Sequence, residues 1–86
     1  MKRQLLFEDA TQAQVDLAKT IKGRILTDLM TFSIEEFNQI NTVGFSKKVI
    51  MDYISYKDDV YFFIQFKNVE SYTAIINTIL KMNREK

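Results

Sequence analysis

The stretch Val60-Tyr-Phe-Phe-Ile-Gln-Phe66 decides the expected fold of this 86-residue chain, because every residue in it except Gln65 is apolar or aromatic. A β-strand points successive side chains to opposite faces. One face would then carry Val60, Phe62, Ile64 and Phe66, and the other Tyr61, Phe63, Gln65 and Lys67. We therefore expect a strand with aromatic residues on both faces, so that its second face needs cover from a helix or from another chain.

Residues 47–56 are the expected partner of this strand. Their apolar positions, which are Val49, Ile50, Tyr53 and Ile54, also fit one face of a helix that begins after Ser46. A high content of β-branched and aromatic residues favours a strand. A short turn through Lys57, Asp58 and Asp59 would then join the two strands into an antiparallel hairpin.

Helical periodicity is clear on both sides of the hairpin. Apolar residues recur every three to four positions over residues 8–32 and again over residues 69–80. Gly23 lies inside the first helix and is a possible site of a bend. Ser33, followed three residues later by Glu36, predicts a capping box and a short helix over residues 34–40. Asn68 is the expected N-cap of the last helix, whose C-terminal end carries Lys81, Arg84 and Lys86.

These elements predict one α+β domain over residues 1–86, in the order α-α-β-β-α, with the hairpin covered by the first and last helices. A first helix of about 24 residues would span about 36 Å. That length exceeds the diameter of about 31 Å expected for a compact chain of this size. The first helix should therefore overhang or bend, and an overhanging apolar face favours a homodimer or a protein partner.

Composition narrows the class of protein. The chain is 47% hydrophobic and 27% charged, with a net charge of +1, which is typical of a globular protein and gives no general attraction to nucleic acid or membranes. No run approaches the roughly 18 apolar residues of a membrane span, and the N-terminus lacks a signal-peptide core. We expect a cytoplasmic protein. The wealth of Ile, Lys, Asn, Phe and Tyr, which have A/T-rich codons, favours a bacterial or phage origin.

Cysteine and histidine are both absent from the sequence. The chain therefore lacks the usual thiol nucleophile, the usual base near neutral pH and the usual nitrogen and sulfur metal ligands. The pair Asp58-Asp59 could bind a hard cation, although aspartates are also common in turns. Together with Gln65-Phe66-Lys67, Asp59 also gives a distorted form of a nuclease-like hairpin. We expect no enzyme, no cofactor, no metal and no small-molecule substrate.

Four lysines, which are Lys47, Lys48, Lys57 and Lys67, would surround the hairpin and alternate with Tyr53, Tyr56 and Tyr61. Such a surface could stack single-stranded bases, but lysines also protect sheet edges and tyrosines bury their rings. A winged-helix arrangement is disfavoured because the segment 34–41 is short and acidic.

The sequence thus favours a non-enzymatic regulatory or inhibitor-type protein that acts through protein–protein contacts. A small nucleic-acid-binding regulator is the alternative, and a carboxylate-dependent nuclease comes third. The expected contact residues lie on the first helix and on the second face of the hairpin: Ile25, Leu29, Ile50, Ile54, Tyr61 and Phe63.

Overall fold

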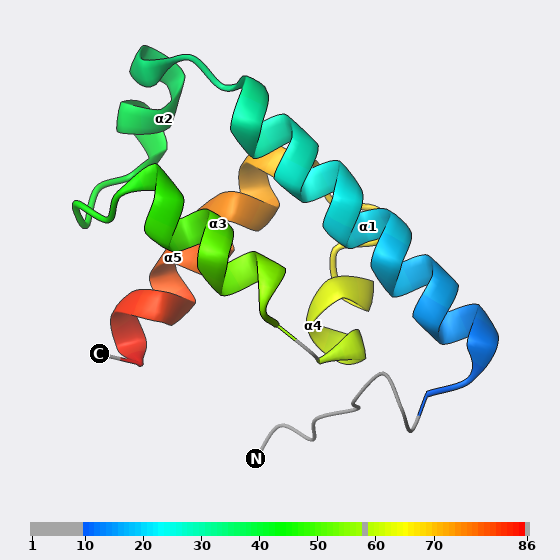
Figure 1. Cartoon of the computed structure of the whole chain (residues 1–86). Coiled ribbons are helices and arrows are strands. Elements are labelled where there is room, and N and C mark those ends of the chain that lie inside the picture. Colours follow the sequence, from blue (N-terminus) through cyan, green and yellow to red (C-terminus); the bar gives the residue numbers. More distant parts are fainter. Residues whose placement is uncertain (1–9, 58, 86) are drawn as a thin grey trace.

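The computed structural model describes residues 10–57 and 59–85, and its elements in these ranges are five α-helices (Figure 1). They are α1 (Gln12–Thr31), α2 (Ile34–Ile40), α3 (Lys47–Ser55), α4 (Val60–Ile64) and α5 (Ser71–Arg84). Both segments of the expected hairpin are helical, so the α+β prediction is wrong and the described part of the chain is mainly helical. The three helices α3, α4 and α5 all contact α1.

The segment 47–56 forms α3 because its start is capped and its two faces differ. The Ser46 hydroxyl accepts a hydrogen bond of 3.1 Å from the Val49 amide, which satisfies one of the unpaired donors of the first turn. Ile50 and Ile54, one turn apart, are fully buried, whereas Val49 is exposed. The helical alternative for this segment is therefore the observed one, and its two isoleucines face a core of helices.

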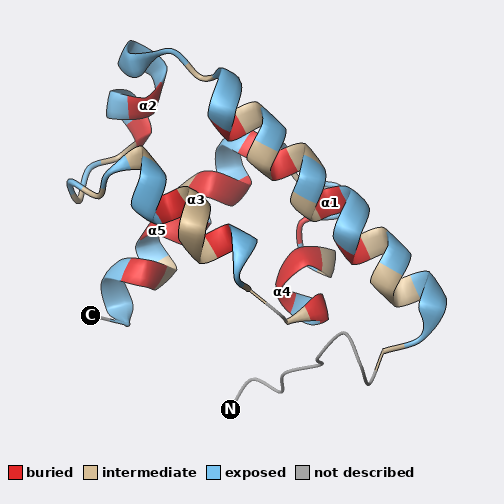
Figure 2. Cartoon of the chain, in the orientation of Figure 1, coloured by how far each residue is buried: buried red, intermediate tan, exposed pale blue. Residues whose placement is uncertain are grey.

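The segment 60–66 holds α4, a helix of five residues that begins at the N-cap Asp59. The Asp59 carboxylate accepts a hydrogen bond of 3.1 Å from the Tyr61 amide. Phe62 and Phe63, which strand alternation would separate, are both buried, and their rings meet edge to face at 5.1 Å. Burial of consecutive aromatic residues is possible here because α4 lies inside the fold, against α1 (Figure 2).

The first helix is confirmed, with a later start than expected. Thr11 is the N-cap and forms a capping box with Gln14, so α1 begins at Gln12; the predicted start at residue 8 lies outside the described residues. The helix continues through Gly23 to Thr31. Its 20 residues span about 30 Å, less than the predicted 36 Å. The length of α1 therefore gives no argument for an overhanging end that binds a partner.

One stripe of α1 enters the core through four buried residues, Ala18, Ile21, Ile25 and Leu29. They belong to one hydrophobic cluster to which all five described helices contribute. From the same helix, Arg24 reaches the connection that follows α4. Its guanidinium donates hydrogen bonds to the carbonyl oxygens of Phe66 at 3.0 Å and of Val69 at 2.7 Å. Arg24 thereby fixes the chain between α4 and α5 against α1.

The capping box of α2 is confirmed, since Ser33 and Glu36 exchange hydrogen bonds of 3.0 and 3.1 Å. The predicted cap of the last helix is wrong. Glu70, not Asn68, is the N-cap of α5, and its side chain forms no capping bond. Lys81 and Arg84 do lie in the last turn of α5, and Lys86 lies outside the described residues.

Between α2 and α3, the chain turns at Gly44, which has a φ of +84°. The Asn41 side chain closes this turn by bonding both the amide and the carbonyl of Phe45. None of the helices in the described ranges is both long enough and apolar enough to cross a lipid bilayer.

Candidate protein-interaction groove between α3 and α5

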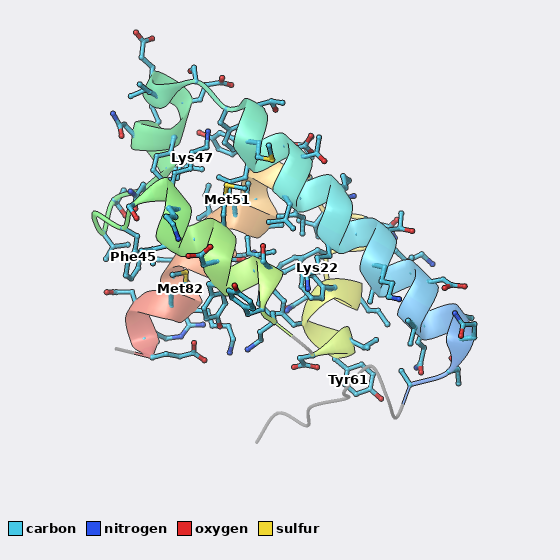
Figure 3. All side chains as sticks on the ribbon, in the orientation of Figure 1. Lys22, Phe45, Lys47, Met51, Tyr61 and Met82 are labelled. Atoms are coloured by element: carbon cyan, nitrogen blue, oxygen red, sulfur yellow. The ribbon has the colours of Figure 1, made fainter. Side chains whose placement is uncertain are left out.

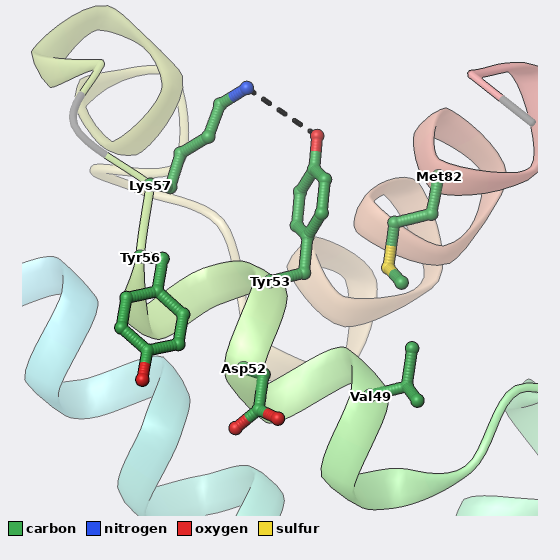
Figure 4. A pocket seen from close by; sticks show the side chains of 6 residues that line it. All are labelled: Val49, Asp52, Tyr53, Tyr56, Lys57 and Met82. Atoms are coloured by element: carbon green, nitrogen blue, oxygen red, sulfur yellow. Dashed lines mark hydrogen bonds between the residues drawn. The ribbon is translucent and has the colours of Figure 1, made fainter.

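A shallow groove of about 390 Å³ lies between α3 and α5 (Figure 4). Its lining is mostly apolar and consists of Val49, Asp52, Tyr53, Tyr56, Lys57 and Met82. We call this surface the α3–α5 groove. It is an open surface site rather than an enclosed cavity, and its shape suits a side chain or a segment of another protein better than a small substrate.

Helical spacing places three of these residues together. Val49, Tyr53 and Tyr56 lie four and seven positions apart on one face of α3 or just after it. The other face of α3 carries Ile50 and Ile54, which are buried in the core. From α5, the Met82 side chain extends toward the groove (Figure 4).

Two of the lining side chains are strongly exposed. Tyr56 is 83% exposed and Val49 is 46% exposed, whereas Met82 is only 8% exposed. Tyrosine and methionine are both enriched at protein interfaces, tyrosine because its large rigid ring has a polar end and methionine because it adapts to different shapes. The groove therefore combines an exposed aromatic side chain with a buried, adaptable floor.

The middle of the groove is held by hydrogen bonds and ring contacts. The Tyr53 hydroxyl donates to the Glu85 carboxylate at 2.8 Å. The Lys57 ammonium donates to the Tyr53 hydroxyl oxygen at 3.4 Å and lies 5.2 Å from the Tyr53 ring centre. Partial burial, followed by the hydrogen bond and the negative charge of Glu85, raises the pKa of Tyr53. Tyr53 thus stays neutral and serves as a fixed wall.

Glu85 connects this wall to α5. The hydrogen bond from Tyr53 is the largest cause that lowers the pKa of the Glu85 carboxyl, and contacts with Lys81 lower it further. The Lys81 ammonium lies 3.2 Å from the Glu85 carboxylate. Glu85 is therefore a charged group that joins α3 to the end of α5 at neutral pH.

A second cavity, of about 220 Å³, lies between α4 and α5. Its lining is mostly polar and consists of Phe62, Gln65, Phe66, Asn77, Leu80, Lys81 and Arg84. We call it the α4–α5 pocket. Its described lining residues include two cations, Lys81 and Arg84, and no carboxylate.

The contact residues expected from the sequence lie mainly in the core. The exposed fraction is 1% or less for Ile25, Leu29, Ile50, Ile54 and Phe63. Their side chains pack against other parts of the same chain, so a contact surface on this fold has to use other residues. Tyr61 is the exception: it is 46% exposed and projects from the start of α4 (Figure 3).

The groove residues that the sequence analysis missed as contact residues are Val49, Tyr56 and Met82. The available signal was the helical spacing of residues 47–56, which turns Val49 and Tyr56 away from the buried Ile50 and Ile54. The single helical face considered for Val49, Ile50, Tyr53 and Ile54 is therefore wrong for Val49. Met82 carries no such signal, because only the packing of α5 beside α3 brings it to the groove.

The lysine and tyrosine surface considered for the hairpin lacks its basis, because the described residues contain no hairpin. Three of the four lysines instead have separate structural roles. Lys47 donates hydrogen bonds to the Met30 and Phe32 carbonyl oxygens at the end of α1 (Figure 3). Lys48 pairs with Asp52 at 2.7 Å on the surface of α3. Lys57 lies over the Tyr53 and Phe62 rings. These three lysines are therefore engaged in contacts within the chain.

The carboxylates give no metal site in the part of the chain that the structure describes, where no cluster of potential ligands is found. Asp59 caps α4, and Asp58 lies outside the described residues. The hairpin that the nuclease hypothesis required is absent from the described ranges. Comparisons of the chain with models of known families, with curated proteins and with solved structures gave no match.

Proposed function

We propose that this protein is a non-enzymatic regulatory or inhibitor-type module that binds another protein in the α3–α5 groove. The observation that carries the proposal is the exposure of Tyr56 and Val49 in a mostly apolar groove that Met82 also lines. Burial of an exposed aromatic side chain is a common source of binding energy at protein interfaces.

The surroundings of the groove support a binding role over a catalytic one. The sequence contains no histidine or cysteine, and the titratable groups of the groove have structural partners. Asp52 pairs with Lys48, and Lys57 contacts the Tyr53 hydroxyl and ring. The groove therefore offers a partner an apolar contact surface with polar residues at its rim. Protein interfaces usually have this composition.

The rigidity of the groove favours binding with little rearrangement. Its floor residue Met82 belongs to the shared core, and its wall residue Tyr53 is bonded to Glu85. A preorganised surface loses less conformational entropy on association than a flexible one. The homodimer expected from the sequence is also still a prediction, and light scattering that gives only the 10.2 kDa monomer mass at micromolar concentration would exclude it.

The experiment compares capture of proteins from a lysate of the source cell by three forms of the immobilised chain. The forms are the wild type, the groove variant Tyr56→Ser and the control Ile34→Ser. Ile34 is 80% exposed and lies at the start of α2, so the control removes a similar exposed apolar side chain outside the groove. A partner that binds the wild type and Ile34→Ser but not Tyr56→Ser supports the proposal. Equal capture by all three forms contradicts it.

A further inference from the structure

The α3–α5 groove and the α4–α5 pocket adjoin each other across a narrow ridge of side chains. The Tyr53 ring of the groove contacts the Phe62 ring of the pocket edge to face, with ring centres 6.3 Å apart. The Lys57 ammonium lies over both rings, 5.2 and 5.3 Å from their centres. A ligand long enough to cross this ridge would contact the two sites at once.

The pocket differs from the groove in charge. Lys81 and Arg84 face it from consecutive turns of α5, together with the amide of Asn77. Lys81 is already paired with Glu85. The Arg84 side chain makes no hydrogen bond or ion pair with any residue that the structure describes. The planar guanidinium of Arg84 is thus available to bind a carboxylate through two parallel hydrogen bonds.

The charges around the two sites add to the same preference. Among the described residues, the cations in or next to the two sites are Lys48, Lys57, Lys81 and Arg84, and the carboxylates are Asp52 and Glu85. Both carboxylates are engaged, Asp52 by Lys48 and Glu85 by Tyr53 and Lys81. A segment that carries negative charge is therefore attracted to this surface, and a basic one is repelled.

We propose that the partner bound at this surface is an acidic amphipathic peptide segment. An apolar side chain of the segment lies in the α3–α5 groove against Tyr56 and Met82, and a carboxylate of the same segment binds Arg84 and Asn77 in the α4–α5 pocket. This inference rests on the proposed function, and it adds the chemistry of the partner and a second contact point. Specificity comes from the carboxylate, because apolar contact alone discriminates little between partners.

The test is selection from a displayed library of random peptides on the immobilised wild-type protein at physiological salt. The bound peptides are then measured against Tyr56→Ser, Arg84→Glu and the control Lys19→Glu. Lys19 is an exposed cation on α1, so the control makes the same charge reversal on another helix. We expect enriched peptides to combine apolar residues with Asp or Glu, and their affinity to fall about tenfold or more in Arg84→Glu but not in Lys19→Glu.

The outcomes separate the two proposals. Peptides that lose affinity in Tyr56→Ser but not in Arg84→Glu, or that show no acidic enrichment, overturn the acidic-segment inference and leave the groove as the binding site. Failure to select any peptide sensitive to Tyr56→Ser overturns both proposals. A parallel titration with inorganic phosphate, followed by NMR, tests the other anion. Saturable shifts at Arg84 with no response to acidic peptides would assign the pocket to phosphate and overturn the inference.

Discussion

The hydroxyl of Tyr53 on α3 donates a hydrogen bond of 2.8 Å to the carboxylate of Glu85 at the end of α5. The two residues are 32 positions apart in the sequence. The bond has opposite effects on its two members: together with burial it raises the pKa of Tyr53, and it lowers the pKa of Glu85. Folding therefore favours neutral tyrosine and charged glutamate.

This bond predicts a specific response to acid. Because the folded state lowers the pKa of Glu85 from its ordinary value of 4.5, the contribution of Glu85 to stability is complete above that pH. It is lost as the pH falls through the lowered value. We expect the free energy of urea unfolding to fall more steeply with acid in the wild type than in Glu85→Gln. The difference should be about 0.5 kcal/mol or less, because Glu85 is on the surface.

Tyr53→Phe provides a second form of the same test, since it removes the main cause of the lowered Glu85 pKa. Its stability should respond less to acid than that of the wild type but more than that of Glu85→Gln, because Lys81 still lowers the Glu85 pKa. Tyr56→Phe is the matched control, because Tyr56 is 83% exposed and its hydroxyl forms no hydrogen bond with the described residues. Identical acid responses in the wild type and Tyr53→Phe would rule out the coupling.

The helical form of residues 60–64 predicts different effects of two substitutions in α4. Phe63 is fully buried and Tyr61 is 46% exposed. Phe63→Ala should therefore lower the free energy of unfolding by about 3 to 5 kcal/mol. Tyr61→Ala should change the same free energy by no more than about 0.5 kcal/mol in either direction. A strand would place the two side chains on the same face. Chemical denaturation distinguishes the two cases, and similar effects of the two substitutions would contradict the helix.

The two glycines predict opposite outcomes for the same substitution. At Gly23, inside α1, an added methyl group would meet nothing within 4 Å beyond the adjoining backbone of α1 itself. Gly23→Ala should therefore raise the free energy of unfolding by about 0.5 to 1 kcal/mol and increase the Tm. At Gly44 the φ of +84° is unfavourable for alanine, so Gly44→Ala should cost about 1 kcal/mol. Thermal unfolding measures both, and a loss of stability in Gly23→Ala would contradict a helix that continues through this position.

The cap of α3 can be tested with two serines of one segment. Ser46→Ala removes the acceptor for the Val49 amide and should lower the free energy of unfolding by about 1 kcal/mol. Ser55→Ala, at the exposed end of α3, is the control and should be neutral or slightly stabilising. Equal stability of the two variants would show that the Ser46 cap contributes nothing.

Much of the helical framework could be predicted because its signals are local. The capping box of Ser33 and Glu36 and the apolar stripes of the first and last helices are visible within a few turns of sequence. These patterns depend on the backbone geometry of a single element. They do not require knowledge of which elements pack together.

The remaining elements could not be assigned from local pattern. The apolar residues of segment 47–56 fit a helix as well as a strand, and their β-branched and aromatic content wrongly favoured the strand. Residues 60–66 are too short and too apolar for periodicity to decide. The decisive feature is tertiary: α4 packs against α1, so that Phe62, Phe63 and Phe66 are all buried. The groove was missed for the same reason, since it exists only where α3 and α5 meet.

The short length of α4 has a consequence for how the molecule opens. A helix of five residues is far below the roughly 12 to 15 residues that an isolated helix needs in water. It persists through its buried aromatic residues and through Arg24, which bonds the carbonyls of Phe66 and Val69. The amide protons of α4 should therefore exchange with deuterium in the same opening event as those in the middle of α1, although the two helices are distant in the sequence.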